Sequence, residues 1–275
     1  MSGLTPHRPW VPHQAHACLV MAHRGASLAR PANTMPAFAA AVAEGADVIE
    51  TDVHWTADGV LVVAHDPVVE TVSDGCGRID EMTFQALREL DFGYRFSPDG
   101  GQTYPFRGKG VMIPTFLELL HAWPNVRVNV DLKPKRARVP AFLEVVDQAS
   151  AFDRVTLASF HHRTLAEARS RCPKLATSAS TREVVEFLAG IPTWKARLGL
   201  GRKVPYVALQ VPNKAYGRTV VDARFVRRAR AIGVEVHVWT VDDPDEMRRL
   251  IALGVDGIVT NSPSTLRKIV LDSPV

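Results

Sequence analysis

Two histidines and two closely spaced carboxylates in the first quarter of the chain could together cleave a phosphate ester. His23 stands in His-Arg-Gly directly after an apolar run, and His65 ends Val-Val-Ala-His. Between them, Glu50 and Asp52 stand in Val-Ile-Glu-Thr-Asp-Val. Histidine titrates near neutral pH, so one ring can accept a proton while another donates one. We therefore predict that His23 and His65 are an acid–base pair for cleavage of a phosphate diester.

The spacing of the acidic residues predicts a metal site. Glu50 and Asp52 are two residues apart on a predicted strand, so their side chains leave the same face. Such carboxylates repel each other unless a cation lies between them, and hard oxygen ligands suit Mg²⁺ or Ca²⁺ better than zinc. Asp131 and Lys133 repeat the spacing in Asn-Val-Asp-Leu-Lys. We predict one divalent cation held by Glu50, Asp52 and Asp131, with Lys133 on a phosphate oxygen. Salt bridges among these groups are the alternative.

Two further side chains could contact a substrate. Arg24 follows His23 and offers a planar guanidinium that matches phosphate oxygens, although an ion pair with Glu50 or Asp52 would also explain it. Trp239 lies near the end of an apolar run, where an indole could stack against the carbon skeleton of a small polyol. An ordinary core position is an equal alternative for Trp239.

Short apolar runs alternate with helical patterns along the chain, which favours a parallel sheet. Eight such units favour a closed (β/α)8 barrel, the TIM barrel, over an open doubly wound sheet, whose glycine-rich phosphate motif is missing after the first strand. The side chains above fall near strand ends, so the barrel mouth is expected to gather them. The predicted strands are Cys18–Ala22, Asp47–Val53, Val126–Leu132, Arg154–Ala158, Lys174–Ser178, Tyr206–Gln210, Glu235–Thr240 and Asp256–Thr260.

The second unit of the predicted barrel is irregular. An extra hairpin strand is expected over 60–64, followed by an insertion over about 67–113 that is rich in glycine, proline and aromatic residues. Long loops at the C-terminal face of a barrel are usually functional, so we interpret this insertion as a candidate lid. Residues 1–17 are an N-terminal extension, and 1–275 is predicted to be a single domain.

Composition narrows the possible partners. A formal net charge of +4 over 275 residues suits an anionic ligand but is small for the chain length, and motifs for nucleic-acid recognition are missing, so no nucleic acid is expected. The N-terminus does not resemble a signal peptide, and no run of about 18 apolar residues occurs. We therefore expect no integral membrane association and a cytoplasmic location. The sequence leaves the oligomeric state open.

These motifs resemble the glycerophosphodiester phosphodiesterase family, whose pattern reads His-Arg-Gly, Pro-Glu-Asn-Thr, Glu-x-Asp, His-Asp, Glu-x-Lys, Trp-Thr and a late Thr-Asp-x-Pro. The blocks run in this order from His23 to Pro263. The resemblance implies a metal-dependent TIM barrel that hydrolyses glycerophosphodiesters to an alcohol and glycerol 3-phosphate. It places the catalytic histidines at His23 and His65, the phosphate contacts at Arg24 and Lys133, and the metal ligands at Glu50, Asp52 and Asp131.

The sequence departs from the family pattern at three positions. Ala32 and Asp131 stand where glutamate is usual, and Asn261 stands where the late motif usually has aspartate. Aspartate is one methylene shorter than glutamate, so direct ligation by Asp131 is the least secure of the three. The changes at Ala32 and Asn261 are expected to affect only peripheral contacts.

Two rival functions remain open. Lysophospholipase D-like hydrolysis of lysophospholipids would use the same chemistry, and the aromatic residues at 92–96 and 104–106 would suit either an acyl chain or a packed lid. The other rival is a noncatalytic barrel that binds phosphodiesters. The presence of both histidines and all the acidic ligands disfavours it.

Overall fold

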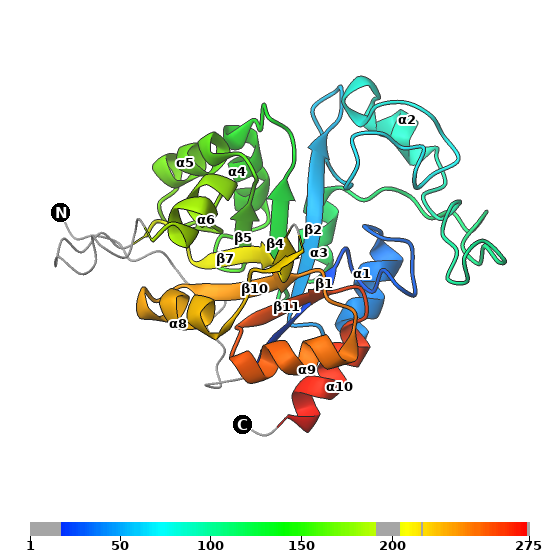
Figure 1. Ribbon diagram of the computed structural model, residues 1–275. Helices are drawn as coiled ribbons and strands as arrows, with labels where there is room; N and C mark the ends of the chain where they lie inside the picture. The colour runs from blue at the N-terminus through cyan, green and yellow to red at the C-terminus, as the bar shows by residue number, and fades with distance from the viewer. Residues whose placement is uncertain (1–17, 191–203, 216, 274–275) are drawn as a thin grey trace.

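The computed structural model describes residues 18–190, 204–215 and 217–273, and its centre is a nearly closed barrel of parallel strands (Figure 1). The strand order is β6-β5-β4-β2-β1-β11-β10-β7. The ends of this order meet through a parallel bridge between Ser178 and Ala208. The predicted TIM barrel is confirmed. Its strands are β1 Leu19–His23, β2 Val48–Trp55, β4 Arg127–Leu132, β5 Val155–Ala158, β6 Ala176–Thr177, β7 Ala208–Pro212, β10 Glu235–Trp239 and β11 Gly257–Thr260.

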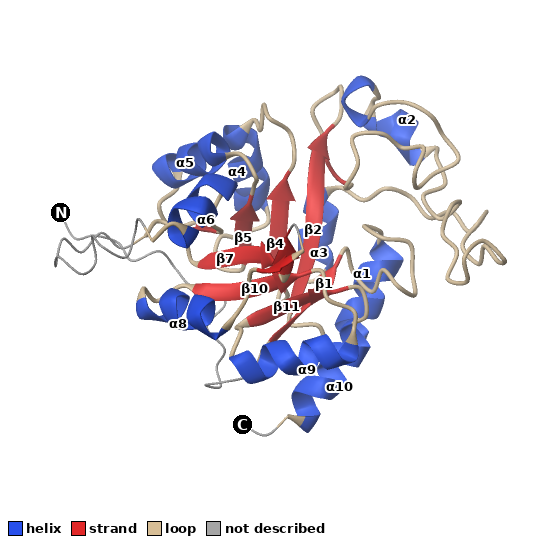
Figure 2. Cartoon of the chain, in the orientation of Figure 1, coloured by secondary structure: helices blue, strands red, loops and turns tan. Residues whose placement is uncertain are grey.

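Helices cover the outside of the barrel, as Figure 2 shows. Two of them, α3 and α6, begin with a capping box in which an N-cap hydroxyl and a glutamate three residues later bond to each other's backbone N–H. A small hairpin, β8 Lys214–Ala215 with β9 Arg218–Thr219, was not predicted. The helices are α1 Met35–Ala43, α3 Phe116–Ala122, α4 Val139–Gln148, α5 His162–Arg171, α6 Thr181–Leu188, α8 Ala223–Ala231, α9 Pro244–Leu253 and α10 Pro263–Asp272.

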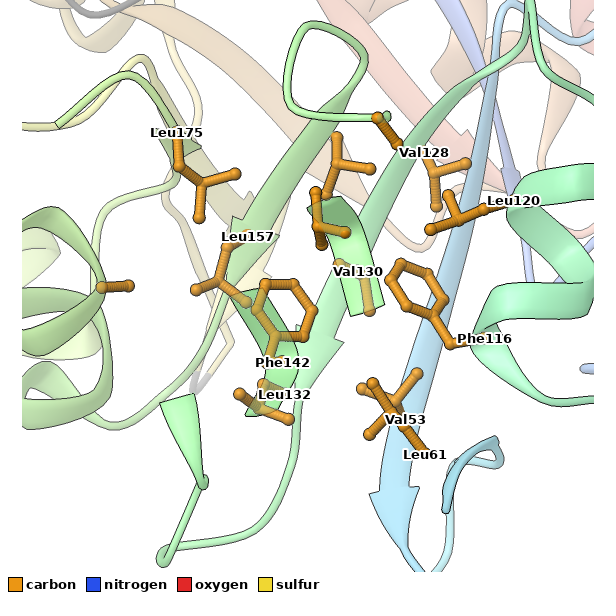
Figure 3. Packing of buried hydrophobic residues seen from close by; sticks show 14 of the residues in the cluster. Val53, Leu61, Phe116, Leu120, Val128, Val130, Leu132, Phe142, Leu157 and Leu175 are labelled. Carbon is orange, nitrogen blue, oxygen red and sulfur yellow. The ribbon is translucent and has the colours of Figure 1, made fainter. Parts of the chain in front are cut away.

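The core between the sheet and the helices is apolar, and pairs of aromatic rings pack against each other within it. Phe116 of α3 and Phe142 of α4 lie with ring centroids 5.9 Å apart, against side chains of β2, β4 and β5 (Figure 3). On the opposite half, Phe187 and Phe225 meet edge to face at 5.1 Å. Full burial of a large apolar side chain contributes about 1.5–3 kcal/mol, so both halves hold the strands firmly in place. A rigid barrel can therefore fix the side chains that project from its strand ends.

The irregular second unit is present and has a small core of its own. β3 Leu61–Val63 pairs antiparallel with β2, as expected for the hairpin strand. The chain then passes through a 3₁₀ turn, Ile79–Glu81, and the short helix α2 Phe84–Arg88 before reaching α3. Buried residues of this segment form a separate cluster: Val62, Ala64, Val69, Ile79, Leu87, Phe92, Val111 and Ile113. In Figure 1 the segment lies to one side of the barrel.

Two predictions about the chain ends stay untested. The N-terminal extension, 1–17, lies outside the described residues. The assignment of 1–275 to a single domain also remains a prediction.

Candidate active site

A cavity of about 530 Å³ opens at the carboxyl ends of the barrel strands. Such an end is where enzymes of this fold place their sites, because the loops that follow the strands gather there. Residues from β1, β2, β4 and β10 and from the segments just after β1, β3 and β4 line it. All eight residues predicted for the site are among them: His23, Arg24, Glu50, Asp52, His65, Asp131, Lys133 and Trp239.

The register of the sheet explains why the acidic side chains meet. Asp52 on β2 is the direct partner of Asp131 on β4. One row below, Glu50 lies between His23 on β1 and Asn129 on β4. Side chains of adjacent parallel strands in one row lie side by side, so two residues distant in sequence become neighbours. Residues two apart on a strand face the same way. The pair Glu50 and Asn129 is therefore followed, one row higher, by the pair Asp52 and Asp131 on the same face.

Lys133 lies between two of the carboxylates. Its Nζ is 2.8 Å from Asp52 Oδ1 and 2.8 Å from Asp131 Oδ2. Burial alone would raise the pKa of Asp52, but Lys133 and Arg24 outweigh it and lower that pKa. Burial raises the pKa of Asp131, with Lys133 opposing it. The salt bridges considered as an alternative are thus present, and Lys133 and the acids form one charged network.

Two buried carboxylate oxygens stay without a partner in this network. Glu50 Oε2 and Asp131 Oδ1 have no hydrogen bond among the described residues, although both are buried. Burial, and next the charge of Asp52, raise the pKa of Glu50 well above its usual value. Unpaired buried oxygens of this kind are costly, and a cation would satisfy them. The donor set therefore fits a hard divalent ion, although the described residues hold no ready-made group of three metal ligands.

The turn after β1 positions Arg24. Arg24 and Asn33 both have left-handed backbone angles, with φ of 57° and 59°, and Gly25 between them has φ of 85°. A Cβ atom on Gly25 would lie 2.6 Å from the backbone carbon of Ala37, so only glycine fits this position. The turn brings Arg24 Nε to 3.2 Å from Asp52 Oδ2 as an ion pair.

Asn33 and Thr34 stand at the start of α1, where capping side chains are common, but their side chains make other contacts. The side chain of Thr34, the N-cap of α1, makes no capping bond and donates to the carbonyl of Pro31 instead. Asn33 turns inward, accepts from Thr51 Oγ1 at 2.8 Å and donates to Asp52 Oδ2 at 3.3 Å. Asn33 therefore supports the acidic cluster rather than the helix.

Both histidines have their Nδ1 atoms engaged. His23 Nδ1 lies 2.7 Å from Asn261 Oδ1, and His65 Nδ1 lies 2.7 Å from Asp66 Oδ1. Burial, and next the nearby Arg24, lower the pKa of His23. In each ring Nε2 is the nitrogen left for a ligand in the cavity. The arrangement can therefore accept one proton and donate another across a bound group.

Comparison with known proteins identifies the chain. The model of the glycerophosphoryl diester phosphodiesterase family matches residues 23–265. The chain belongs to this family. A protein of Mycobacterium tuberculosis, named a probable glycerophosphodiester phosphodiesterase 2, is 33% identical over 92% of this chain and 90% of its own length. A glycerophosphodiester phosphodiesterase of Caldanaerobacter subterraneus is 31% identical over 92% of this chain and 97% of its own.

A solved structure extends the likeness to the fold. A phosphodiesterase of Oleispira antarctica, in complex with the product sn-glycerol-3-phosphate, superposes with a TM-score of 0.75 at 26% identity, over 94% of this chain and 98% of its own. As a member of the glycerophosphoryl diester phosphodiesterase family, the chain is an enzyme of the phosphoric diester hydrolase class. No helix within the described residues has the length and apolar character needed to cross a membrane.

Two residues that line this cavity were not predicted from the sequence. Asn129 and Gln210 line the cavity, with Gln210 Nε2 donating to Asn129 Oδ1 at 2.9 Å. Asn129 could have been found, because it precedes Asp131 by two on the same strand. The expectation that Asn261 affects only peripheral contacts was wrong, since its side chain contacts His23 directly. That contact joins residues 238 positions apart, so no local pattern reveals it.

In the structure the insertion does not line this cavity, and its interpretation as a lid stays a prediction. No residue from 67–113 is among the described residues that line it, because this segment packs on its own small core beside β2 and β3. Its aromatic residues, considered as contacts for an acyl chain, are directed elsewhere: Phe96 and Phe106 stack edge to face at 5.5 Å. An apolar wall instead forms another part of the cavity lining. It consists of Phe160, Ala179, Val184, Val185, Val211 and Pro212.

Proposed function

We propose that the chain hydrolyses glycerophosphodiesters to an alcohol and glycerol 3-phosphate by acid–base catalysis with His23 and His65, in the presence of a divalent cation. One observation carries the proposal. Three carboxylates, two cations and two histidines from separate strand ends line a single cavity. The names of the relatives support the substrate class, and the product complex of the Oleispira antarctica neighbour supports glycerol 3-phosphate as a product.

In this proposal the cationic side chains bind the phosphate. Arg24 and Lys133 are both partly exposed to the cavity, with 26% and 19% of their side chains accessible. A guanidinium can pair with two phosphate oxygens, and an ammonium adds a point charge. Trp239, at the end of β10, offers its indole to the carbon skeleton of the glycerol group.

The divalent cation would be held by Glu50, Asp52 and Asp131. The unpaired oxygens Glu50 Oε2 and Asp131 Oδ1 support this assignment. Both Mg²⁺ and Ca²⁺ accept such oxygen ligands. A bound ion there would supply Lewis-acid polarisation of a phosphate oxygen.

The histidines would move two protons. One ring accepts the proton of the attacking hydroxyl, while the other donates a proton to the oxygen of the leaving alcohol. The attacking group is water, or a neighbouring glycerol hydroxyl whose cyclic product water then opens.

Single alanine substitutions test the paired histidines. His23→Ala and His65→Ala are each expected to lower kcat for glycerophosphocholine by about 10²- to 10⁴-fold, with little change in melting temperature. His161→Ala is a matched control, because His161 does not line the cavity among the described residues. Near-normal turnover in either cavity variant would refute the pair. Absence of hydrolysis by the unaltered enzyme with any of several diesters in Mg²⁺ or Ca²⁺ would refute the activity itself.

The apolar wall favours a second candidate, hydrolysis of a diester that carries one hydrocarbon chain, as in a lysophospholipid. Phe160 is 59% exposed and Val185 is 58% exposed, so both offer apolar surface that a ligand could cover. Both line the same cavity as the charged residues. A chain lying along this wall would cover them while the phosphate stays among the cations. The wall itself carries no charged side chain.

Polar substitutions on this wall separate the two candidates. Val185→Asn is expected to lower kcat/KM for lysophosphatidylcholine by about tenfold while sparing glycerophosphocholine, because contact with the acyl chain is lost. Leu188→Asn on the same helix is the control, since Leu188 is 46% exposed but outside the described cavity lining. Equal losses for both substrates, or no hydrolysis of lysophosphatidylcholine, would reject the second candidate and leave the first intact.

A further inference from the structure

A chain of hydrogen bonds links His23 to the opposite end of the sequence. Asn261, directly after β11, brings its Oδ1 to 2.7 Å from His23 Nδ1. The hydroxyl of Ser27 lies 2.7 Å from the same oxygen. This position is one at which the sequence departs from the family pattern, with an amide in place of the usual carboxylate.

Asp242 determines which way the Asn261 amide faces. Asn261 Nδ2 donates to Asp242 Oδ2 at 2.6 Å, and the backbone N–H of Asn261 donates to Asp242 Oδ1 at 2.8 Å. Thr260 Oγ1 also donates to Asp242 Oδ1, at 2.9 Å. An ionised carboxylate only accepts hydrogen bonds, so the NH₂ group of the amide must point to it. The amide oxygen is therefore the atom that faces His23.

The direction of the amide settles the tautomer of the ring. An amide oxygen cannot donate, so the contact at 2.7 Å requires a hydrogen on His23 Nδ1. In a neutral imidazole the other nitrogen, Nε2, then carries a lone pair. Because His23 lines the cavity, this lone pair is available to a bound hydroxyl.

We propose that Asn261, held by Asp242, is a positioning residue that keeps His23 in the Nδ1–H tautomer and makes it the proton acceptor of the reaction. This inference rests on the proposed function and assigns one of its two histidine roles. The O–H bond of the attacking group breaks, its hydrogen forms a bond to Nε2, and its electron pair attacks the phosphorus. The bond from phosphorus to the leaving oxygen then breaks, and that oxygen keeps the electron pair and takes a proton from the other histidine. Nδ1–H stays bonded to Asn261 throughout. The role of proton donor falls to His65, whose Nδ1 faces the carboxylate of Asp66.

Asn261 and Asp242 can be exchanged to test the arrangement. Asn261→Asp alone places two carboxylates against each other where one donor and one acceptor stood. Asp242→Asn alone removes the group that orients the amide. The double variant Asn261→Asp/Asp242→Asn restores one donor and one acceptor between the two positions, again with an acceptor facing His23. Asn261→Leu removes the acceptor and adds no charge.

The tautomer can be observed directly without any turnover. Two-bond ¹H–¹⁵N correlation spectra of enzyme labelled with [¹⁵N]histidine distinguish a ring protonated on Nδ1 from one protonated on Nε2. His23 is assigned by its absence in His23→Ala, and His65 is an internal control. We expect the Nδ1–H pattern for His23 in the unaltered enzyme and in the double variant, and a loss of that pattern in Asn261→Leu.

Kinetics of the same variants give the second readout. Asn261→Leu is expected to lower kcat for glycerophosphocholine on the order of a hundredfold and to change KM by less than about threefold. Each single exchange should also lower kcat, and the double variant should recover most of the loss, since the two sites act as one unit. Melting temperatures measured in parallel identify any variant that is simply misfolded.

The outcomes separate this inference from the proposed function. An Nε2–H pattern for His23 in the unaltered enzyme overturns the inference, even if hydrolysis is normal. Full kcat in Asn261→Leu overturns it too, as does a double variant no better than the worse single exchange. If the enzyme hydrolyses no diester while the Nδ1–H pattern is seen, the arrangement stands and the proposed function fails.

Discussion

Asp52 and Asp131 are direct partners on neighbouring strands, and the ammonium of Lys133 lies 2.8 Å from an oxygen of each. Two buried carboxylates so close together would repel each other strongly without that ammonium. Lys133 thus stabilises the protein as well as facing the cavity. Its two roles can be separated experimentally.

Removal of Lys133 should destabilise the enzyme in the absence of divalent ions. In Lys133→Met, we expect the free energy of unfolding in chelator to fall by about 2–3 kcal/mol, because a buried charge network loses its cation. Added Mg²⁺ or Ca²⁺ should reduce this loss if the ion binds the same carboxylates. Denaturant unfolding with and without chelator measures both effects. Lys135→Met is the control, since Lys135 is exposed two residues further on; a similar loss in both variants would contradict the prediction.

Asp131 should contribute to ion affinity despite its short side chain. We expect Mg²⁺ or Ca²⁺ to raise the melting temperature of the unaltered enzyme, and Asp131→Asn to weaken apparent affinity by about tenfold or more, because one charged ligand is lost. Calorimetric titration measures the affinity independently of turnover. Glu144→Gln on the exposed face of α4 is a charge-matched control. An unchanged affinity in Asp131→Asn would exclude Asp131 from the ligands.

Gly25→Ala should be costly for two separable reasons. The φ of 85° strains any residue with a Cβ atom, and that atom would meet the Ala37 backbone at 2.6 Å. We expect a loss of about 2–4 kcal/mol in unfolding free energy, together with reduced turnover because Arg24 shifts. Gly100→Ala isolates the strain, since its φ is 70° but nothing lies within 4 Å of the added atom. If both variants lose equally in urea unfolding, close packing at Gly25 is not the cause.

The ion pair of Glu183 should make the folding stability of the enzyme depend on pH in the acid range. Arg169 on α5 holds Glu183 on α6 through contacts of 2.6 and 3.2 Å. Burial alone would raise the pKa of Glu183, but the hydrogen bonds and charge of Arg169 outweigh it and lower that pKa below 4.5. A lowered folded-state pKa means that the stabilisation is complete above the unfolded-state value and is lost as pH falls through the lower folded-state value.

The unaltered enzyme should therefore lose more stability than Glu183→Gln as pH falls below about 5 and through the lowered folded-state pKa of Glu183. Urea unfolding at a series of pH values measures the difference. Glu186→Gln, which breaks only the exposed pair with Arg182, should follow the unaltered enzyme. Parallel curves for Glu183→Gln and the unaltered enzyme would show that the pair carries no linked proton.

The sequence was sufficient to predict the barrel because each core strand is a short apolar run that ends near a polar residue. The eight predicted strands differ from the observed ones by only one or two residues at most ends, as in β5 Val155–Ala158. The site residues were found for a related reason: a spacing of two along a strand places side chains on one face, and Glu50 with Asp52 shows this directly.

Contacts between segments far apart in the sequence could not be predicted. The role of Asn261 depends on a neighbour 238 residues away, and the bond of Gln210 to Asn129 spans 81. The position of Lys133 between two acids depends on the register of β2 against β4, which periodicity alone does not set. For the insertion, length indicated a functional loop, and the sequence did not reveal that Ile79 and Leu87 are buried in a small core of its own.

That separate packing has an evolutionary consequence. The segment satisfies its own apolar side chains and is linked to the cavity through Thr71, which donates to Asp66, the partner of His65, so changes far from Thr71 should be tolerated better than changes beside it. Descendants of this enzyme could therefore acquire new surface properties there while conserving their turnover.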